Sequence, residues 1–512
     1  GGVPGPAVAD RNLPVRLIRF GFLVAVVAAF APAVIPIAAV MCLVFALAAL
    51  ALGSGGRPQD YALAAAVGVV APVSLHGPWS FDFLQGLSWR WIVGPMSPEA
   101  DVNSMLELLQ FAPGAPPAHW VALGLVAAAA LALLVAKAVH FHLAATGWLL
   151  AVTFWFLTWA GRRGWVPFSL PTAEAMLAPV AIGLTLAVIV GVRAMETELV
   201  GAEHRPAAQR AIAGLGVIAV ACVFFTGLLS SLSGLWEAPT QSFSESAQFL
   251  VRQQESENDD VGPGRVLWIG DASVLPLDVV VSDSGIEYAV SDGGRAEARG
   301  RWMARPVGAT DGIGAQLDLA RAGEVVRLGR LLAPYGIDNV VVVRQLAPAP
   351  YVGPQIDPAG GVVRALSQQL DLERVPGVPS LIVFHNISSA GLAPVLPSAE
   401  AASASTAVEQ LDIDLARSSA PIINHRPGKW ILTMPAESEV LLALDSNGLV
   451  ATGARSEVNA GFDDLAVIPA GPAGEVYIEY GPRLRRQLAL LGQFLLVAVG
   501  AILAQTRREV VG

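Results

Sequence analysis

Four carboxylates lie between two apolar segments in the first part of the chain, where a loop is expected. A carboxylate in such a loop can act as a general base that activates the hydroxyl group of an acceptor molecule. Acidic residues on a hydrated loop also serve solubility alone, so both interpretations stay open. The candidate catalytic residues are Asp82, Glu99, Asp101 and Glu107.

Tryptophan residues offer a second kind of chemistry, because the apolar face of a sugar ring packs well against a large aromatic ring. Trp268 lies in the middle of a strand-like run and is expected in a hydrophobic core. Trp302 and Trp430 are the candidates for binding a glycan.

Metal chemistry has one candidate motif, Asp412-Ile-Asp414. Two carboxylates at this spacing can hold a divalent cation. Polar and apolar residues alternate from Gln410 to Leu415, however, as on a half-exposed strand. We therefore predict no metal site and no cofactor.

Because Gly-x-Ser-x-Gly, His-Glu-x-x-His and Walker-type motifs do not occur, this chain alone carries no complete catalytic set, and whether it is an enzyme stays open.

Composition places these residues in a membrane protein. Apolar residues make up 54% of the 512 residues and charged residues only 14%, which is too apolar for an ordinary soluble protein. The net charge is −10, and the acidic excess falls on residues 231–482. Nucleic acid is therefore not expected as a partner.

A helix that spans a membrane needs about 20 mostly apolar residues. Residues 20–53 form one unbroken apolar stretch, which Pro32 and Pro36 either divide into two helices or kink into one. With two helices there, about eight spans are expected. They lie near residues 14–31, 34–53, 60–76, 118–136, 142–160, 173–192, 211–230 and 487–504.

Basic residues predict the orientation, since Lys and Arg accumulate in cytoplasmic loops. Most basic residues next to the spans share one side in the eight-span arrangement. The exceptions are Arg162 and Arg163, and the cluster Arg483, Arg485 and Arg486 before the last span. We therefore expect a multi-pass protein of the cell membrane with both ends cytoplasmic. Residues 77–117 then form an outer loop, and residues 231–482 form a large extracytoplasmic domain.

Periodicity divides the chain further. Residues 1–230 are expected as the transmembrane bundle, residues 231–390 as an α/β domain, residues 391–419 as a linker, residues 420–482 as a small β-sandwich, and residues 483–512 as the last span and a cytoplasmic tail. Strands of the α/β domain are expected at 265–270, 277–282, 337–343 and 381–384. Helices are expected around 313–334 and 360–372.

Several phrases occur in a fixed order through the second half of the chain. They are RVLWIGD at 265–271, RLGRLLAPYGIDNVVVV at 327–343, LDLERVPGVPSLIVFHN at 370–386, GKW at 428–430 and YIEY at 477–480. Together they resemble the carboxy-terminal half of actinobacterial glycosyltransferase family 2 membrane proteins. That resemblance implies a role in building the cell wall, and a cytoplasmic nucleotide-sugar domain before the first span, either upstream or as a separate chain.

Three hypotheses follow. In the first, the chain is the membrane and extracytoplasmic portion of such a glycosyltransferase, anchors the catalytic part and handles a lipid-linked or wall glycan. In the second, the chain is a self-contained glycosyltransferase that uses a polyprenyl-phosphate-linked sugar outside the membrane, with an acid of the 77–117 loop as base. In the third, it is a non-catalytic envelope scaffold or export partner. Membrane lipid is a partner in all three.

Overall fold

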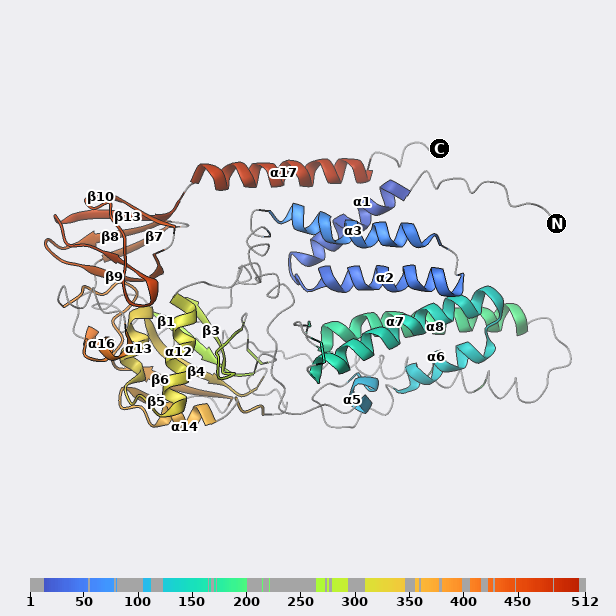
Figure 1. The fold of residues 1–512 in the computed structure, drawn as a ribbon, viewed down its shortest axis with the longest axis horizontal. Helices are drawn as coiled ribbons and strands as arrows, with labels where there is room; N and C mark the ends of the chain where they lie inside the picture. Colours follow the sequence, from blue (N-terminus) through green and yellow to red (C-terminus); the bar gives the residue numbers. More distant parts are fainter. Residues whose placement is uncertain are drawn as a thin grey trace. The chain divides into compact units, whose positions relative to one another are not determined.

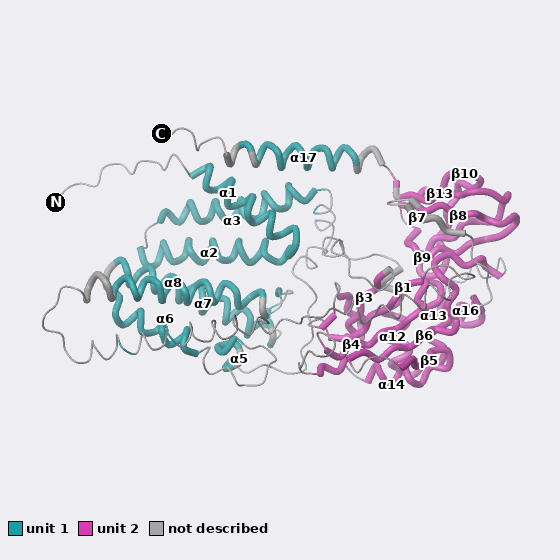
Figure 2. Tube along the Cα trace, turned by 180° about the vertical axis from the view of Figure 1, so that it is seen from behind, with its two compact units in different colours: residues 1–94, 98–237, 487–512 teal, residues 95–97, 238–486 magenta. Residues whose placement is uncertain are grey.

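The structure is a computed structural model. It describes chiefly residues 13–77, 105–111, 123–199, 264–292, 309–345, 355–397, 406–446 and 448–505, with short gaps inside some of these ranges. The chain divides into two compact units, shown in Figure 2. We call residues 1–94, 98–237 and 487–512 the helical unit, and residues 95–97 and 238–486 the polar unit.

Helices make up the described part of the helical unit (Figure 1). They are α1 (Leu13–Ala28), α2 (Val34–Leu52), α3 (Pro58–Leu75), α5 (Met105–Leu109), α6 (Leu123–Val135), α7 (Ala138–Arg162), α8 (Ala173–Leu199) and α17 (Arg483–Gln505). Two helices, α1 and α2, occupy the apolar stretch 20–53, and the break between them includes Pro32. A proline lacks the N–H group that would continue the helix, which favours a break at this position.

Three helices of the described part are long and apolar enough to cross a membrane, rather than the eight that we expected. They are Val34–Leu52, Val139–Gly161 and Ala175–Ala194. Within the described residues, the expected first and fourth spans form helices of 16 and 13 residues, fewer than the about 20 that cross a hydrocarbon core about 30 Å thick. In the last span, the apolar part is limited to Gln487–Gly500. The expected span 211–230 lies outside the described residues.

Glycines allow α7 and α8 to cross at close range. A Cβ atom on Gly147 would lie 2.4 Å from the carbonyl oxygen of Gly183, and a Cβ on Gly183 would lie 2.4 Å from that of Gly147. Ala151 and Ala187, four residues further along each helix, are fully buried. Small residues at this spacing are typical of membrane helices that associate through close backbone packing.

We predict that Gly183→Leu separates α7 from α8 and lowers stability by at least about 2 kcal/mol, since the new side chain meets backbone rather than a movable side chain. The measurement is the thermal unfolding midpoint of the full chain in one detergent. Gly492→Leu on α17 is the matched control, because no atom lies within 4 Å of a Cβ at Gly492. Equal midpoints for the two variants would contradict the close crossing.

A six-stranded sheet forms the first part of the polar unit, in the order β2-β3-β1-β4-β6-β5. Its strands are β1 (Arg265–Ile269), β2 (Val280–Val281), β3 (Glu287–Asp292), β4 (Ile337–Val343), β5 (Leu372–Val375) and β6 (Leu381–Asn386). Only β1 and β4 pair in parallel, and the other pairs are antiparallel. The valine-rich strand β4 is buried throughout, as expected for a central strand.

Helices cover one face of this sheet. They are α12 (Ala309–Ala322), α13 (Leu328–Leu332) and α14 (Val362–Ser367). The 3-10 turn η4 (Ala333–Tyr335) directly follows α13. Their leucines and isoleucines share a core with Leu267, Val340 and Val342 of the sheet. The expected α/β content is therefore present, as a mixed sheet with a helical layer.

Polar side chains fix α13 against the sheet. Gln369 Oε1 and Asp371 Oδ2 accept hydrogen bonds from the backbone N–H groups of Leu328 and Arg330, at 2.9 and 2.8 Å. The amide of Asn386 donates to the carbonyl oxygens of both Gly329 and Ile337. These bonds satisfy backbone groups at the start of a helix that would otherwise be buried without partners.

Two small antiparallel sheets form the last part of the polar unit, in the orders β10-β13-β8-β7 and β11-β12-β9. The strands are β7 (Ile422–Arg426), β8 (Lys429–Met434), β9 (Val440–Asp445), β10 (Leu449–Gly453), β11 (Asn459–Ala460), β12 (Leu465–Ile468) and β13 (Gly474–Tyr480). Residues from β8, β9, β10, β12 and β13 share one hydrophobic core. The alternation of apolar and polar residues over 429–434, 440–444 and 476–480 predicted three of these strands, β8, β9 and β13.

A buried arginine closes the loops of this part. The Arg455 guanidinium donates to the carbonyl oxygens of residues 435, 438, 469, 471 and 472, over 2.5 to 3.3 Å. Burial lowers the pKa of Arg455 from its ordinary value, because it disfavours the charged form. The five bonds compensate for that burial, so one side chain holds the loop before β9 and the loop before β13.

Part of the segment 391–419, which we expected to be a linker, belongs to the core. Ala443 N and Leu441 N donate to the carbonyl oxygens of Leu392 and Pro394, at 2.9 and 3.0 Å. Val395 forms a bridge with Val440. The segment therefore extends the edge of β9, and the short helix α16 (Ala407–Leu411) follows it with a capping box at Thr406.

Candidate functional site

Of the six residues that the sequence nominated, two lie in the described part of the chain. Asp82, Glu99, Asp101 and Trp302 lie outside the described residues. The backbone of Glu107 belongs to α5, but its side chain is not among the described atoms. Trp430 lies on β8 in the polar unit. The described candidate sites are therefore the surroundings of α5 and those of Trp430.

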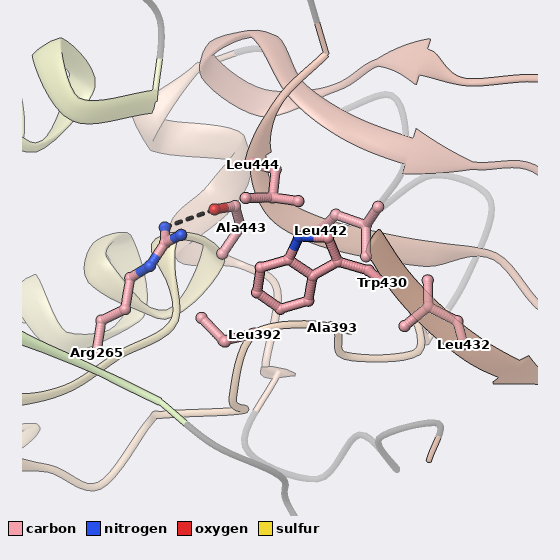
Figure 3. Close-up of a pocket in the computed structure, with 8 residues that line it drawn as sticks. All are labelled: Arg265, Leu392, Ala393, Trp430, Leu432, Leu442, Ala443 and Leu444. Carbon is pink, nitrogen blue, oxygen red and sulfur yellow. Dashed lines mark hydrogen bonds between the residues drawn. The ribbon is translucent and has the colours of Figure 1, made fainter. Parts of the chain in front are cut away.

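Trp430 lines a hollow between the two parts of the polar unit (Figure 3). Its walls come from β1, from the segment before α16, and from β8 and β9. The lining residues are Arg265, Leu392, Ala393, Trp430, Leu432, Leu442, Ala443 and Leu444. The hollow contains about 220 Å³ of empty space, part of it open to solvent. The enclosed part amounts to about 10 Å³, room for about one water molecule, so a sugar ring would bind at the open mouth of the hollow rather than inside it.

Strand alternation explains why the indole faces this hollow. Leu432 and Met434 point into the core of the two-sheet part, and Trp430 has the same parity on β8. Its partner across the strand pair is Ile478, which is fully buried. Trp430 itself is half-buried, so the indole stands at the edge of the core with part of its surface accessible.

Arg265 supplies the polar wall of the hollow. Its Nη1 donates to the carbonyl oxygen of Ala443 at 2.5 Å, across 178 positions of sequence. Its backbone N–H donates to Gly336. The guanidinium is thereby held at the junction of the six-stranded sheet and β9, opposite the indole of Trp430 in Figure 3.

A second contact fixes the same junction. The buried hydroxyl of Tyr335 donates to the carboxylate of Asp463 in the 3-10 turn η7 (Phe462–Asp464). Burial, followed by the charge of Asp463, raises the pKa of Tyr335 well above its ordinary value. The phenol is therefore protonated at physiological pH and serves as a donor. Asp463 has φ 47° and ψ 43°, a strained conformation for a residue with a side chain.

The other nominated place is α5 in the helical unit. Trp155 of α7 donates through Nε1 to the carbonyl oxygen of Leu108, at 3.2 Å. Leu108 is fully buried, and the ring of Phe111 lies 6.4 Å from that of Trp155. The turn that carries Glu107 is thus attached to a membrane helix rather than projecting freely.

The Asp412-Ile-Asp414 motif has a structural role. The carboxylate of Asp414 lies 3.5 Å from the guanidinium of Arg330, whose Nη1 also donates to Leu411. These contacts attach the end of α16 to α13. Within the described part of the chain, no group of three or more His, Cys, Asp or Glu side chains is placed to hold a metal ion.

Sequence reasoning missed Arg265, Leu392 and Ala393 in the hollow. In the sequence, Arg265 is the polar first residue of a predicted strand, and residues 392–393 belong to the predicted linker. Only the packing of distant segments brings them to Trp430. A signal was nevertheless present, because an arginine at the start of an otherwise buried strand needs a partner.

The composition and the three apolar helices define a membrane protein with a folded polar unit. No protein-family model matches the chain, and no curated protein matches it. It is similar to two solved structures of the arabinofuranosyltransferase AftD from Mycobacteria. The first has 12% identity and a TM-score of 0.32, and the match covers 93% of this chain and 47% of that one.

The second, a mutant of the same protein, has 13% identity and a TM-score of 0.28. That match covers 93% of this chain and 49% of the other. The chain therefore spans about half the length of the proteins that it matches. Membership of glycosyltransferase family 2 stays a prediction from the sequence.

We predict that Arg265→Met weakens the junction between β1 and β9 and lowers stability by about 1–2 kcal/mol, because a carbonyl loses its charged donor. The unfolding midpoint of the full chain in detergent measures this. Arg364→Met on α14, where the arginine is exposed, is the control and should change little. An unchanged midpoint for Arg265→Met would show that the hydrogen bond does not hold the junction.

Proposed function

We propose that the chain is the membrane-embedded and extracytoplasmic portion of a cell-envelope glycosyltransferase of the family 2 type. It anchors the catalytic part and binds the glycan on which that part acts. The observation that supports this most is the hollow at Trp430, which combines an aromatic face, apolar walls and a guanidinium. Those are the groups that recognise a sugar ring through its apolar face and its hydroxyls.

The arrangement of the chain supports the same proposal. The polar unit lies between helices α8 and α17 in sequence, so it is joined to the helical unit at both of its ends. A glycan held at Trp430 would thus stay near the membrane in which its lipid carrier is embedded. The full proposal places both ends in the cytoplasm and the polar unit outside, with the nucleotide-sugar domain upstream or on a separate chain.

We predict that Trp430→Ala reduces binding of a cell-wall glycan fragment about tenfold, since an aromatic contact of this kind contributes roughly 0.5–1.5 kcal/mol beyond the area that it buries. Trp430→Phe should keep part of the affinity. The measurement is isothermal titration of the full chain in detergent with solubilised wall polysaccharide.

Tyr477→Ala is the matched control for this titration. Tyr477 lies on β13 of the same sheet, with a parity opposite to that of the buried Val476 and Ile478. The Tyr477→Ala substitution therefore removes an aromatic ring from this sheet without changing the hollow. Wall glycan that binds equally well to the wild type and Trp430→Ala would overturn the proposed role of the hollow.

One observation favours a second function, the self-contained enzyme that uses a polyprenyl-phosphate-linked sugar. The bond from Trp155 to Leu108 attaches the turn with Glu107 to the membrane bundle, where a lipid-linked donor would be met. A carboxylate there could activate the acceptor hydroxyl as a general base.

Single amide variants separate the two functions. If the chain transfers sugar by itself, one of Asp82→Asn, Glu99→Gln, Asp101→Asn or Glu107→Gln should lower the rate at least about 100-fold, which is the usual contribution of a general base. The assay is transfer from a polyprenyl-phosphate sugar in detergent. Unchanged transfer in all four variants would rule out the hypothesis that the chain is a self-contained enzyme with a base in this loop. If the chain binds glycan but transfers no sugar, the two remaining hypotheses are the anchoring portion of a glycosyltransferase and the non-catalytic scaffold.

A further inference from the structure

A buried amide without partners lies beside α5. Gln110 follows directly after this helix, and its backbone N–H donates to Leu106 at 3.0 Å. Its side chain is only 2% exposed, yet neither Nε2 nor Oε1 has a hydrogen-bond partner. A buried primary amide without partners is unfavourable, because it has given up its hydrogen bonds to water.

Apolar and aromatic groups surround this position. The flanking residues Leu109 and Phe111 pack against the core that α7 and α8 share. The rings of Phe111 and Trp148 each lie 6.4 Å from that of Trp155. Since α7 and α8 contain two of the apolar segments long enough to cross a membrane, the amide is buried beside helices of membrane-spanning length. Polar groups in such an environment commonly mark a binding site.

The backbone at this position is also strained. Phe111 has φ +55°, in the left-handed region that costs energy for a residue with a bulky side chain. The helix before it has only five residues, and the indole of Trp155 on α7 donates a hydrogen bond to its Leu108. A short and strained segment of this kind can shift to admit a ligand more readily than a long helix can.

The chemistry of an amide selects the ligand. Gln110 presents a donor at Nε2 and an acceptor at Oε1. An anionic phosphate would satisfy only the donor, and a cationic amine only the acceptor. A hydroxyl group satisfies either, and two neighbouring hydroxyls satisfy both. The half-buried ring of Phe111, which lies beside Trp155, adds a face against which the C–H groups of a sugar ring can pack.

We propose that Gln110 binds neighbouring hydroxyls of the carbohydrate headgroup of a membrane glycolipid, at a site formed by α5 and the aromatic face of α7. This inference rests on the proposed function in taking the ligand to be a lipid-linked glycan. It uses neither Trp430 nor the polar unit, so the two proposals can fail separately.

The test places the full chain in phosphatidylcholine nanodiscs that also contain either monoglucosyl diacylglycerol or phosphatidylglycerol. Native mass spectrometry of the released protein measures how much of each lipid stays bound. The wild type should retain the glucosyl lipid at least tenfold more than phosphatidylglycerol. Gln110→Met, which keeps the length of the side chain, should abolish that preference.

Gln493→Met is the matched control. Gln493 is another glutamine of the helical unit, but its Nε2 already donates to the carbonyl oxygen of Leu75 at 2.6 Å. This variant should keep the preference for the glucosyl lipid. In nanodiscs of phosphatidylcholine alone, Gln110→Met should raise the unfolding midpoint, because an unpaired buried amide is removed, and Gln493→Met should lower it.

Three results would overturn the proposal. Retention of the glucosyl lipid by Gln110→Met would show that another group binds it. Equal or stronger retention of phosphatidylglycerol by the wild type would assign the site to an anion. A lower midpoint for Gln110→Met in phosphatidylcholine alone would show that the amide has a structural partner, such as a buried water, rather than a role in binding. Titration of wall glycan against Trp430→Ala is unaffected by any of these results.

Discussion

The hydrogen bond from Arg265 to the carbonyl oxygen of Ala443 determines the geometry of the hollow that we propose as a glycan site. It joins the first strand of the six-stranded sheet to β9 of the two-sheet part, and the hollow at Trp430 lies at that junction. A charged donor at 2.5 Å restricts how far β1 and β9 can move apart. The contact between Tyr335 and Asp463 restrains the same junction a second time. The two parts of the polar unit therefore act as one rigid frame for a single aromatic side chain.

The helical unit depends on a different constraint, the absence of side chains where its helices cross. Gly147 and Gly183 let α7 and α8 approach until their backbones touch. On the same pair of helices, Trp155 holds the turn with Glu107, and the amide of Gln110 lies beside that turn. Close packing of small residues and attachment of a polar turn thus occur on the same helices. A membrane site built in this way needs few residues, because the helix backbones fix its position.

Local patterns predicted much of the polar unit. The valine-rich run of β4 and the alternating runs of β8, β9 and β13 are strands at the expected positions, because burial and period-two alternation are properties of a segment itself. Of the expected strand at 277–282, the described residues form the two-residue strand Val280–Val281, which pairs with β3. The count of membrane spans was predicted less well. Hydrophobicity alone predicted longer helices than the 16 and 13 residues that the structure describes for α1 and α6.

The candidate site could be predicted only in part. Aromatic type and position nominated Trp430, but no local pattern joins it to Arg265, because that contact depends on how distant segments pack. Gln110 was missed for a similar reason. A glutamine after a short helix is ordinary in sequence, and only burial without partners distinguishes it.

The most direct test of the central claim is an electron cryomicroscopy map of the full chain in nanodiscs with saturating wall glycan fragment. The account predicts density for one sugar ring against the indole of Trp430, with a polar group within hydrogen-bond distance of Arg265. A hollow without density at saturation, or density for the ring at another surface, would contradict it.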